Sequence, residues 1–158
     1  NNVVIENYLV GSQNKKDVDF YESTDISAAN SKVNIINKKN YTPGDVKELD
    51  SKLRNKEKKI QVSIDSYCED NNLQPDLIKI DVEGAELQVL KGARNVILTF
   101  KPLIYLSVHT QQIKDFGCDL KDLLIEIESY NFEILNIDGS EFVHFQNIEY
   151  ILREKIKL

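Results

Sequence analysis

The sequence contains no methionine and no tryptophan, and it has only three prolines and six glycines among 158 residues. So little glycine and proline argues against a fibrous or low-complexity chain. Hydrophobic residues make up 41% and charged residues 29%, which is ordinary for one folded domain with a sizeable core. Because a translation product begins with methionine unless it is processed, we interpret residues 1–158 as a single domain that is incomplete at its N-terminus.

Long apolar runs and a signal peptide are missing as well. No stretch approaches the roughly 18 apolar residues of a membrane helix, and Cys68 and Cys118 lack the spacing of a metal site. Acidic residues outnumber basic residues by 26 to 20, and the resulting net charge of −6 argues against an obligate nucleic-acid binder. We therefore expect a cytoplasmic protein with reduced thiols and without a nucleic-acid or membrane partner.

Strand-like and helix-like segments alternate along the chain. The apolar run "DLIKIDV" (76–82) is typical of a strand covered on both faces, and Leu87, Leu90, Ala93 and Ile97 follow it at helical spacing. Alternation of this kind predicts an α/β fold with a mostly parallel sheet. We expect further strands at 2–11, 17–23, from Ile60, 103–108, 132–137, 141–145 and 149–155, a helix capped by Asp119, a helix that Asp65 caps, and a hairpin turn at Asp138-Gly139.

A polar excursion interrupts this alternation over residues 28–59. Val46, Leu49 and Leu53 fall on one face of a helix within it, which predicts a short amphipathic helix. Excursions of this length are often lids or binding loops. We expect this one to be a polar excursion or a lid.

Acidic side chains gather where the strand at 76–82 gives way to a helix. Asp81, Glu83 and Glu86 lie at this junction, and His109 ends the next strand along the chain. Neighbouring parallel strands lie about 4.8 Å apart and end at the same edge of a sheet, which is where ligands bind in open α/β folds. A carboxylate and an imidazole placed together there could deprotonate a hydroxyl, bind a divalent cation or orient a substrate.

A structural interpretation of the same residues stays open. Acids in the first turn of a helix stabilise it by about 0.3–1 kcal/mol each through the helix dipole, and Glu86 suits that role as well as a functional one. A histidine after an apolar run is more often packed or solvated than catalytic.

The run "IKIDVEGAELQVLKGA", followed by "LIYLSVH", resembles the hallmark of the FkbM-type methyltransferases, Lys-x-Asp-x-Glu-Gly-x-Glu leading to a proline-led strand with a terminal histidine. The segment "NVVIENYLVG" is similar to the third sheet strand of that family, "VDFYES" to the small strand after it, and "IQVSIDSYC" to its Thr-Leu-Asp segment. The resemblance extends over most of the chain.

This resemblance implies a class I, Rossmann-like methyltransferase fold with a C-terminal antiparallel hairpin. It implies S-adenosylmethionine as cofactor and O-methylation of a sugar or another small hydroxylated metabolite. Carried over to this sequence, Asp81 and Glu83 lie beside the methyl-transfer centre, Glu86 supports them and His109 faces them. Asn7 and Tyr8 match the edge that meets adenine. We expect Asp81 or His109 to act as a base or metal anchor, and Glu83 and Glu86 to bind substrate hydroxyls.

Two departures from the family pattern leave alternatives open. Ser107 stands where the family commonly has an acid, so no metal ligand is assigned and a divalent cation stays unsupported. The glycine-rich first loop and the acidic second strand do not occur in this chain, so we expect the first strands to be missing and the chain alone to be inactive. The alternatives are a truncated, non-catalytic binding or assembly module, which could form a homodimer, and another doubly wound enzyme such as a nucleotide-sugar transferase.

Overall fold

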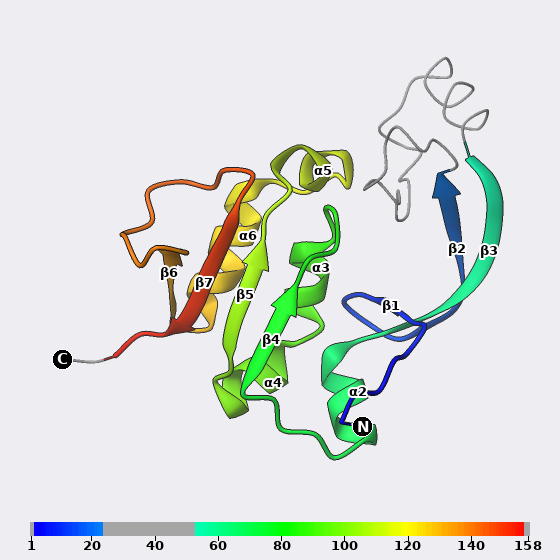
Figure 1. Ribbon diagram of the computed structural model, residues 1–158, viewed down its shortest axis with the longest axis horizontal. Helices are drawn as coiled ribbons and strands as arrows, with labels where there is room; N and C mark the ends of the chain where they lie inside the picture. The colour runs from blue at the N-terminus through cyan, green and yellow to red at the C-terminus, as the bar shows by residue number, and fades with distance from the viewer. Residues whose placement is uncertain (1, 24–52, 157–158) are drawn as a thin grey trace.

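The computed structural model describes residues 2–23 and 53–156, which form two β-sheets and a set of short helices (Figure 1). One sheet has the strand order β4-β5-β7-β6 and the other has the order β1-β3-β2. The strands are β1 (Leu9–Val10), β2 (Lys15–Ser23), β3 (Leu53–Val62), β4 (Leu77–Ile80), β5 (Leu103–Ser107), β6 (Phe132–Asn136) and β7 (Glu149–Glu154). The helices are α2 (Ile64–Asp70), α3 (Glu86–Lys91), α4 (Arg94–Phe100), α5 (Thr110–Asp115) and α6 (Leu120–Ser129).

The four-stranded sheet is mixed. The predicted α/β class is confirmed, but the prediction of a mostly parallel sheet is wrong for the described residues. The crossover through α3 and α4 makes β4 and β5 parallel, whereas β7 inserts between β5 and β6 and is antiparallel to both. One parallel and two antiparallel pairings result.

The strand predicted at 141–145 does not form. Glu141 makes only an isolated bridge to Leu135, although the turn at Asp138-Gly139 is present and Asn136 N–H donates to the Ser140 carbonyl over 3.0 Å. The chain instead continues as a loop until β7, which is the strand that pairs with β6. The C-terminal antiparallel pair is therefore β6–β7, joined by a long loop.

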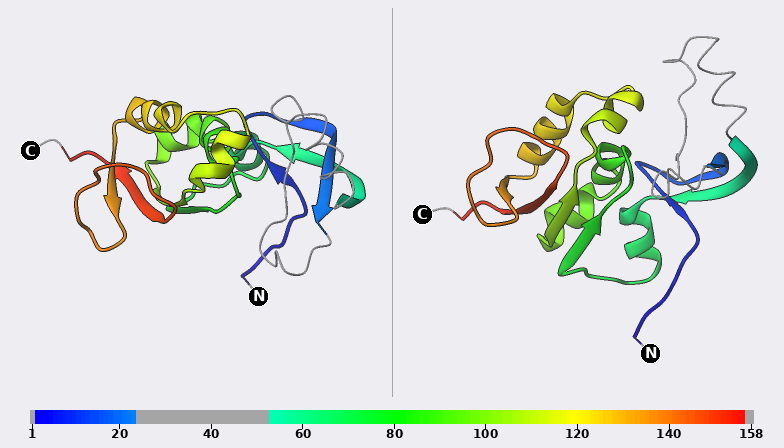
Figure 2. Two further views of the ribbon diagram at one scale, coloured as in Figure 1. Left: turned by 90° about the horizontal axis from the view of Figure 1, so that it is seen from above. Right: turned by 45° about the horizontal axis from the view of Figure 1, so that its top comes forward.

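Helices cover one face of the four-stranded sheet. In Figure 1, α3, α4 and α6 lie behind the strands, and the view from above in Figure 2 places α6 on that same side. The predicted apolar positions Leu87, Leu90, Ala93 and Ile97 are all at most 2% exposed and belong to the main core. Gly92 and Ala93 divide the expected helix into two short ones, α3 and α4. Asp119 caps α6 as predicted, in a capping box with Asp122.

Strand β4 has one buried face. Ile80 is 1% exposed, whereas Leu77, on the opposite face, is 54% exposed. The prediction of a strand covered on both faces is therefore wrong for the described part of the chain, because the helices pack on one side only. Lys79 shares the open face of β4, and this placement brings its amine to the sheet edge described below.

The three-stranded sheet forms from the N-terminal segments. The strand predicted at 2–11 is reduced to Leu9–Val10, the two positions that pair in parallel with β3, while β2 forms as predicted and pairs with β3 in antiparallel fashion. Strand β3 begins at Leu53, so the excursion expected over 28–59 ends before that residue. The rest of that excursion, with Val46 and Leu49, lies outside the described residues.

Asp65 connects this sheet to the main core in a way the sequence did not predict. Ser63, not Asp65, caps α2, and its hydroxyl accepts from Ser66 N–H over 3.1 Å. The Asp65 carboxylate instead accepts from the backbone N–H groups of Asn95 and Val96, over 3.0 and 2.9 Å, at the start of α4. Free N–H groups at a helix start attract such an acceptor.

Among the helices of residues 2–23 and 53–156, none is long and apolar enough to cross a membrane.

Candidate functional site

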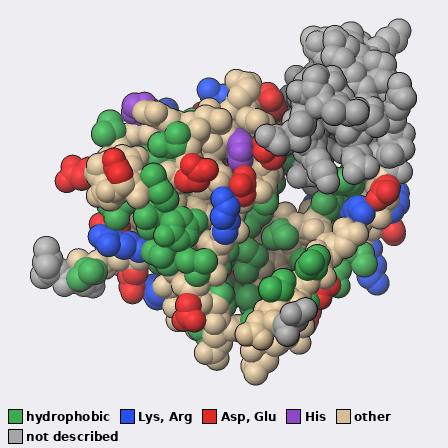
Figure 3. All heavy atoms as spheres, in the orientation of Figure 1, with side chains coloured by type: hydrophobic (Ala, Val, Ile, Leu, Met, Phe, Trp, Pro, Cys, Tyr) green, Lys and Arg blue, Asp and Glu red, His purple; other side chains and the backbone are tan. Residues whose placement is uncertain are grey.

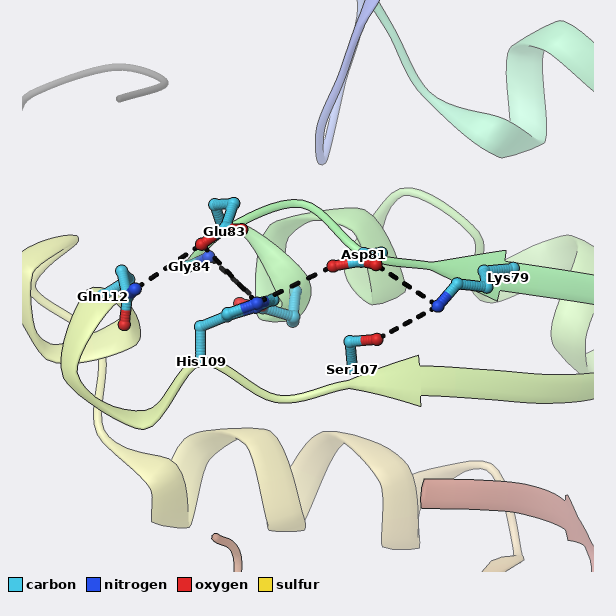
Figure 4. A network of polar contacts seen from close by, with 8 residues as sticks. Lys79, Asp81, Glu83, Gly84, Ser107, His109 and Gln112 are labelled. Atoms are coloured by element: carbon cyan, nitrogen blue, oxygen red, sulfur yellow. Dashed lines mark hydrogen bonds and ion pairs between the residues drawn. The ribbon is translucent and has the colours of Figure 1, made fainter. Parts of the chain in front are cut away.

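The parallel pair β4–β5 sets the position of the site. Ile80 is paired with Leu106 in the register of these strands, so the residues that follow, Asp81 on one strand and Ser107 on the other, reach the same edge. Two residues further on, the segments that follow β4 and β5 bring Glu83 and His109 to that edge. The close-up in Figure 4 shows these side chains pointing toward one another between the two segments.

A tight turn after β4 makes this arrangement possible. Glu83 and Gly84 both have positive φ, 51° and 109°, and a Cβ on Gly84 would lie 2.7 Å from the Cβ of Gln112 in α5. Glycine is the residue that tolerates both the conformation and the close approach. The turn directs Gly84 N–H to Glu86 Oε1, over 3.1 Å, and starts α3 directly beneath the site.

Glu86 anchors His109 from below. The Glu86 side chain is 0% exposed, and its Oε1 lies 2.6 Å from Nδ1 of His109. An ionised carboxylate has no proton to donate, so Nδ1–H is the donor in this contact with the Glu86 carboxylate. Nε2 of His109 therefore faces the cleft. The other Glu86 oxygen, Oε2, is buried, and no donor from the described ranges reaches it.

Asp81 and Glu83 face the free side of the imidazole. Nε2 of His109 lies 3.7 Å from Asp81 Oδ1 and 3.5 Å from Glu83 Oε2. The Lys79 amine holds the other Asp81 oxygen at 3.2 Å and donates to Ser107 Oγ, also over 3.2 Å. Figure 4 shows this chain of contacts running from Lys79 to His109. Asp81, Glu83 and His109 are called the acid–imidazole cluster below.

The cluster borders a cleft of about 490 Å³. Its lining includes Asp81, Glu83, Ser107, His109, Asn147 and Glu149, so it is predominantly polar. In Figure 3, which has the orientation of Figure 1, this face shows a histidine side chain bordered by acidic side chains. A cleft of this size and polarity suits a small hydroxylated molecule better than an apolar one.

The structure places the predicted site residues in two groups. Asp81, Glu83, Glu86 and His109 come together at one edge, but Glu86 is fully buried under His109, so it orients the imidazole and does not reach a substrate hydroxyl. Asn7 and Tyr8 do not line the cleft. Asn7 is exposed, and Tyr8 packs edge-on against Tyr67 with ring centroids 6.4 Å apart.

Sequence reasoning missed the roles of Lys79, Ser107 and Gln112. Lys79 interrupts an apolar run, and that interruption was the available signal for a partner at the strand end. Ser107, taken above as the loss of an acid, is 5% exposed and accepts from Lys79. Gln112 lies on α5, a helix with no strong sequence pattern, and its amide reaches Glu83 Oε2 over 3.5 Å.

Three side chains at this edge have the chemistry of metal ligands. Asp81, Glu83 and His109 each present one ligand atom, and these atoms all lie within 4.8 Å of one another. The same atoms could instead accept hydrogen bonds from substrate hydroxyl groups. The geometry thus permits proton abstraction, hydroxyl binding or cation binding.

Comparison with known proteins identifies one relationship. The family model described as "Methyltransferase FkbM domain" matches residues 1–145. No curated protein and no solved structure matches the chain.

Proposed function

The chain belongs to the FkbM methyltransferase family, and from this membership we propose that it serves as an S-adenosylmethionine-dependent O-methyltransferase acting on a hydroxyl of a sugar or another small metabolite. One observation carries the choice of site: the acid–imidazole cluster sits at the end of the parallel strand pair, on a polar cleft, with its imidazole anchored by a buried glutamate. Two unpaired cysteines agree with a cytoplasmic enzyme.

The acidic side chains of the cleft suit the cationic end of S-adenosylmethionine. That end carries a sulfonium and an ammonium, and the carboxylates of Asp81 and Glu83 offer complementary negative charge at the cleft wall. Asp81 would hold the cofactor there, and Asn7 and Tyr8 stay our candidates for the adenine edge. When bound, S-adenosylmethionine supplies a methyl group already activated by its sulfonium.

The residues of this chain then have to position the acceptor and assist the loss of its hydroxyl proton. Nε2 of His109 faces the cleft because Nδ1–H is engaged by Glu86, so Nε2 is the basic nitrogen available at the acceptor hydroxyl. A positioned base contributes about 10²–10⁴-fold to a rate. Asp81 and Glu83 accept hydrogen bonds from acceptor hydroxyl groups, and Lys79 fixes the Asp81 carboxylate for that task.

The rate of methyl transfer by the Asp81→Asn variant, compared with that of the wild type, tests this proposal. Release of S-adenosylhomocysteine is followed in the complete protein with a panel of sugars and hydroxylated metabolites, for the wild type, for Asp81→Asn and for Asp70→Asn. Asp70 is an exposed carboxylate at the end of α2, so its change is a matched control. We expect Asp81→Asn to lose at least about 100-fold in rate, because the acceptor and the cofactor are then misplaced, and Asp70→Asn to lose none.

Two outcomes would count against the proposal. Equal rates for wild type and Asp81→Asn would remove Asp81 from the reaction. If calorimetry detected no binding of S-adenosylmethionine by the complete wild-type protein and no acceptor were methylated, the alternative of a non-catalytic binding module would be favoured.

A further inference from the structure

We infer that the acid–imidazole cluster is a binding site for one divalent transition-metal ion, held by Asp81, Glu83 and Nε2 of His109. We infer the binding of the ion from the geometry of these three side chains. Its role in catalysis depends on the proposed methyl transfer. Such an ion would position the acceptor hydroxyl and would lower the pKa of that hydroxyl.

The two distances from His109 Nε2 to the acids are near those between ligands of one ion and are too long for hydrogen bonds. A hydrogen bond from a ring nitrogen to a carboxylate spans about 2.7–3.2 Å, but Nε2 of His109 stands 3.7 Å from Asp81 and 3.5 Å from Glu83. Two ligands that each lie about 2.0–2.2 Å from one tetrahedral ion are roughly 3.3–3.6 Å apart. These two distances are close to that range, and all three ligand atoms lie within 4.8 Å of one another, so an ion between them requires the side chains to draw together.

The contact between Glu86 and His109 prepares the imidazole for coordination. A metal-ligating histidine almost always donates its other ring N–H to a carboxylate or carbonyl, which fixes the tautomer and the ring orientation. Here Nδ1 lies 2.6 Å from Oε1 of a glutamate that is 0% exposed, so the lone pair of Nε2 points to the side of the two acids. This buried partner is a feature independent of the acids themselves.

The charges at the site also favour a cation. Three carboxylates, from Asp81, Glu83 and Glu86, lie within 3.7 Å of one imidazole, and among the lysines of residues 2–23 and 53–156 only Lys79 contacts one of them, at Asp81. Oε2 of Glu86 is buried without a donor from the described part of the chain. Burying negative charge without compensation is costly, and a divalent ion next to His109 would offset that cost.

The ligand set selects the kind of ion. Magnesium and calcium prefer shells made of oxygen, whereas an imidazole together with carboxylates suits zinc, manganese, cobalt or iron. Three protein ligands leave at least one coordination position open toward the cleft, as in catalytic rather than structural sites. An acceptor hydroxyl would occupy that position. With Nε2 coordinated, the ion takes over from the imidazole the task of promoting proton loss.

Calorimetric titration of the metal-free full chain with Zn²⁺, Mn²⁺ and Mg²⁺ chlorides tests the inference without any methyl acceptor. We expect one ion per chain, with Zn²⁺ bound more tightly than Mn²⁺, in the usual order for such sites, and Mg²⁺ more weakly than both. Absence of Zn²⁺ and Mn²⁺ binding would overturn the inference, and so would a preference for Mg²⁺.

Matched variants locate the ion. Glu83→Gln and His109→Gln each remove one ligand, and we expect each to weaken Zn²⁺ binding at least about tenfold. Glu86→Gln keeps every ligand but disturbs the imidazole, and we expect a loss of roughly 10–100-fold. Glu149→Gln removes the same charge from another part of the cleft lining and should change the affinity little. An effect of Glu149→Gln as large as that of Glu83→Gln would indicate general attraction by negative charge and would overturn the assigned ligands.

Urea unfolding of the metal-free variants shows whether each one folds. Glu83→Gln changes a side chain that is 30% exposed, so this variant keeps the test available if Glu86→Gln does not fold. The two proposals fail in different ways. Ion binding without methyl transfer supports the metal site and counts against the proposed function. Methyl transfer that persists in a chain without affinity for Zn²⁺ or Mn²⁺ overturns the metal site and leaves the proposed function standing.

Discussion

Gly84→Ala probes how tightly the turn after β4 is packed against α5. Gly84 has a φ of 109°, and a Cβ built there would meet the Gln112 Cβ at 2.7 Å and the Gln112 backbone carbon and oxygen at 2.8 Å. Backbone atoms of a helix cannot yield as the end of a flexible side chain can. Relief would require α5 to move, and His109, the N-cap residue of α5, would move with it.

Gly139 supplies the control for the cost of conformation alone. Its φ is also positive, at 83°, but an added Cβ there would meet nothing within 4 Å. A non-glycine residue in such a conformation costs about 1–3 kcal/mol, and overpacking adds about 1–3 kcal/mol. We therefore expect Gly139→Ala to lower the free energy of unfolding by about 1–3 kcal/mol, and Gly84→Ala to lower it by about 2–6 kcal/mol.

Urea unfolding of the two variants and the wild type measures this difference. The informative quantity is the free energy of unfolding of Gly139→Ala minus that of Gly84→Ala, because it isolates the contact with Gln112. We expect it to be positive by about 1–3 kcal/mol. A value of zero or below would show that the turn is not packed against α5, and the anchoring of His109 described here would lose its support.

Two further predictions concern α2 and the thiols. Asp65→Ala removes the acceptor for the N–H groups of Asn95 and Val96. We expect urea unfolding to show that it lowers the free energy of unfolding by about 1–2 kcal/mol, with Asp70→Ala as a neutral control. A loss below about 0.3 kcal/mol would contradict the capping of α4. Burial raises the pKa of the Cys68 thiol, and the Asp65 carboxylate adds to this effect, so iodoacetamide should modify Cys118 first at neutral pH. Faster modification of Cys68 in the folded chain, located by mass spectrometry, would contradict its burial.

Much of the main core could be predicted from periodicity. The apolar positions from Leu87 to Ile97 and the Asp119 cap of α6 are local patterns, and the described structure contains both. The order of strands in the sheet could not be predicted in this way, because a local sequence pattern does not determine which strands β7 pairs with. The mixed sheet and the loop in place of a strand at 141–145 follow from that pairing.

At the site too, local features could be predicted from the sequence and tertiary features could not. That Asp81 and His109 share an edge follows from parallel strands with a crossover between them, and the sequence indicates this. That Glu86 is fully buried beneath His109 depends on the conformation of Gly84 and on the packing of α5, which are tertiary features. Asp65 was predicted to cap its own helix because local spacing allowed it, but Ser63 occupies that position and frees Asp65 for α4.

The rate of S-adenosylhomocysteine release by the complete protein, as wild type and as His109→Gln and compared on the same acceptor, tests most directly whether the acid–imidazole cluster is the reactive site. We expect the wild type to turn over and His109→Gln to be at least about 100-fold slower, with unchanged affinity for S-adenosylmethionine in calorimetry. Equal turnover by the two proteins would contradict the account.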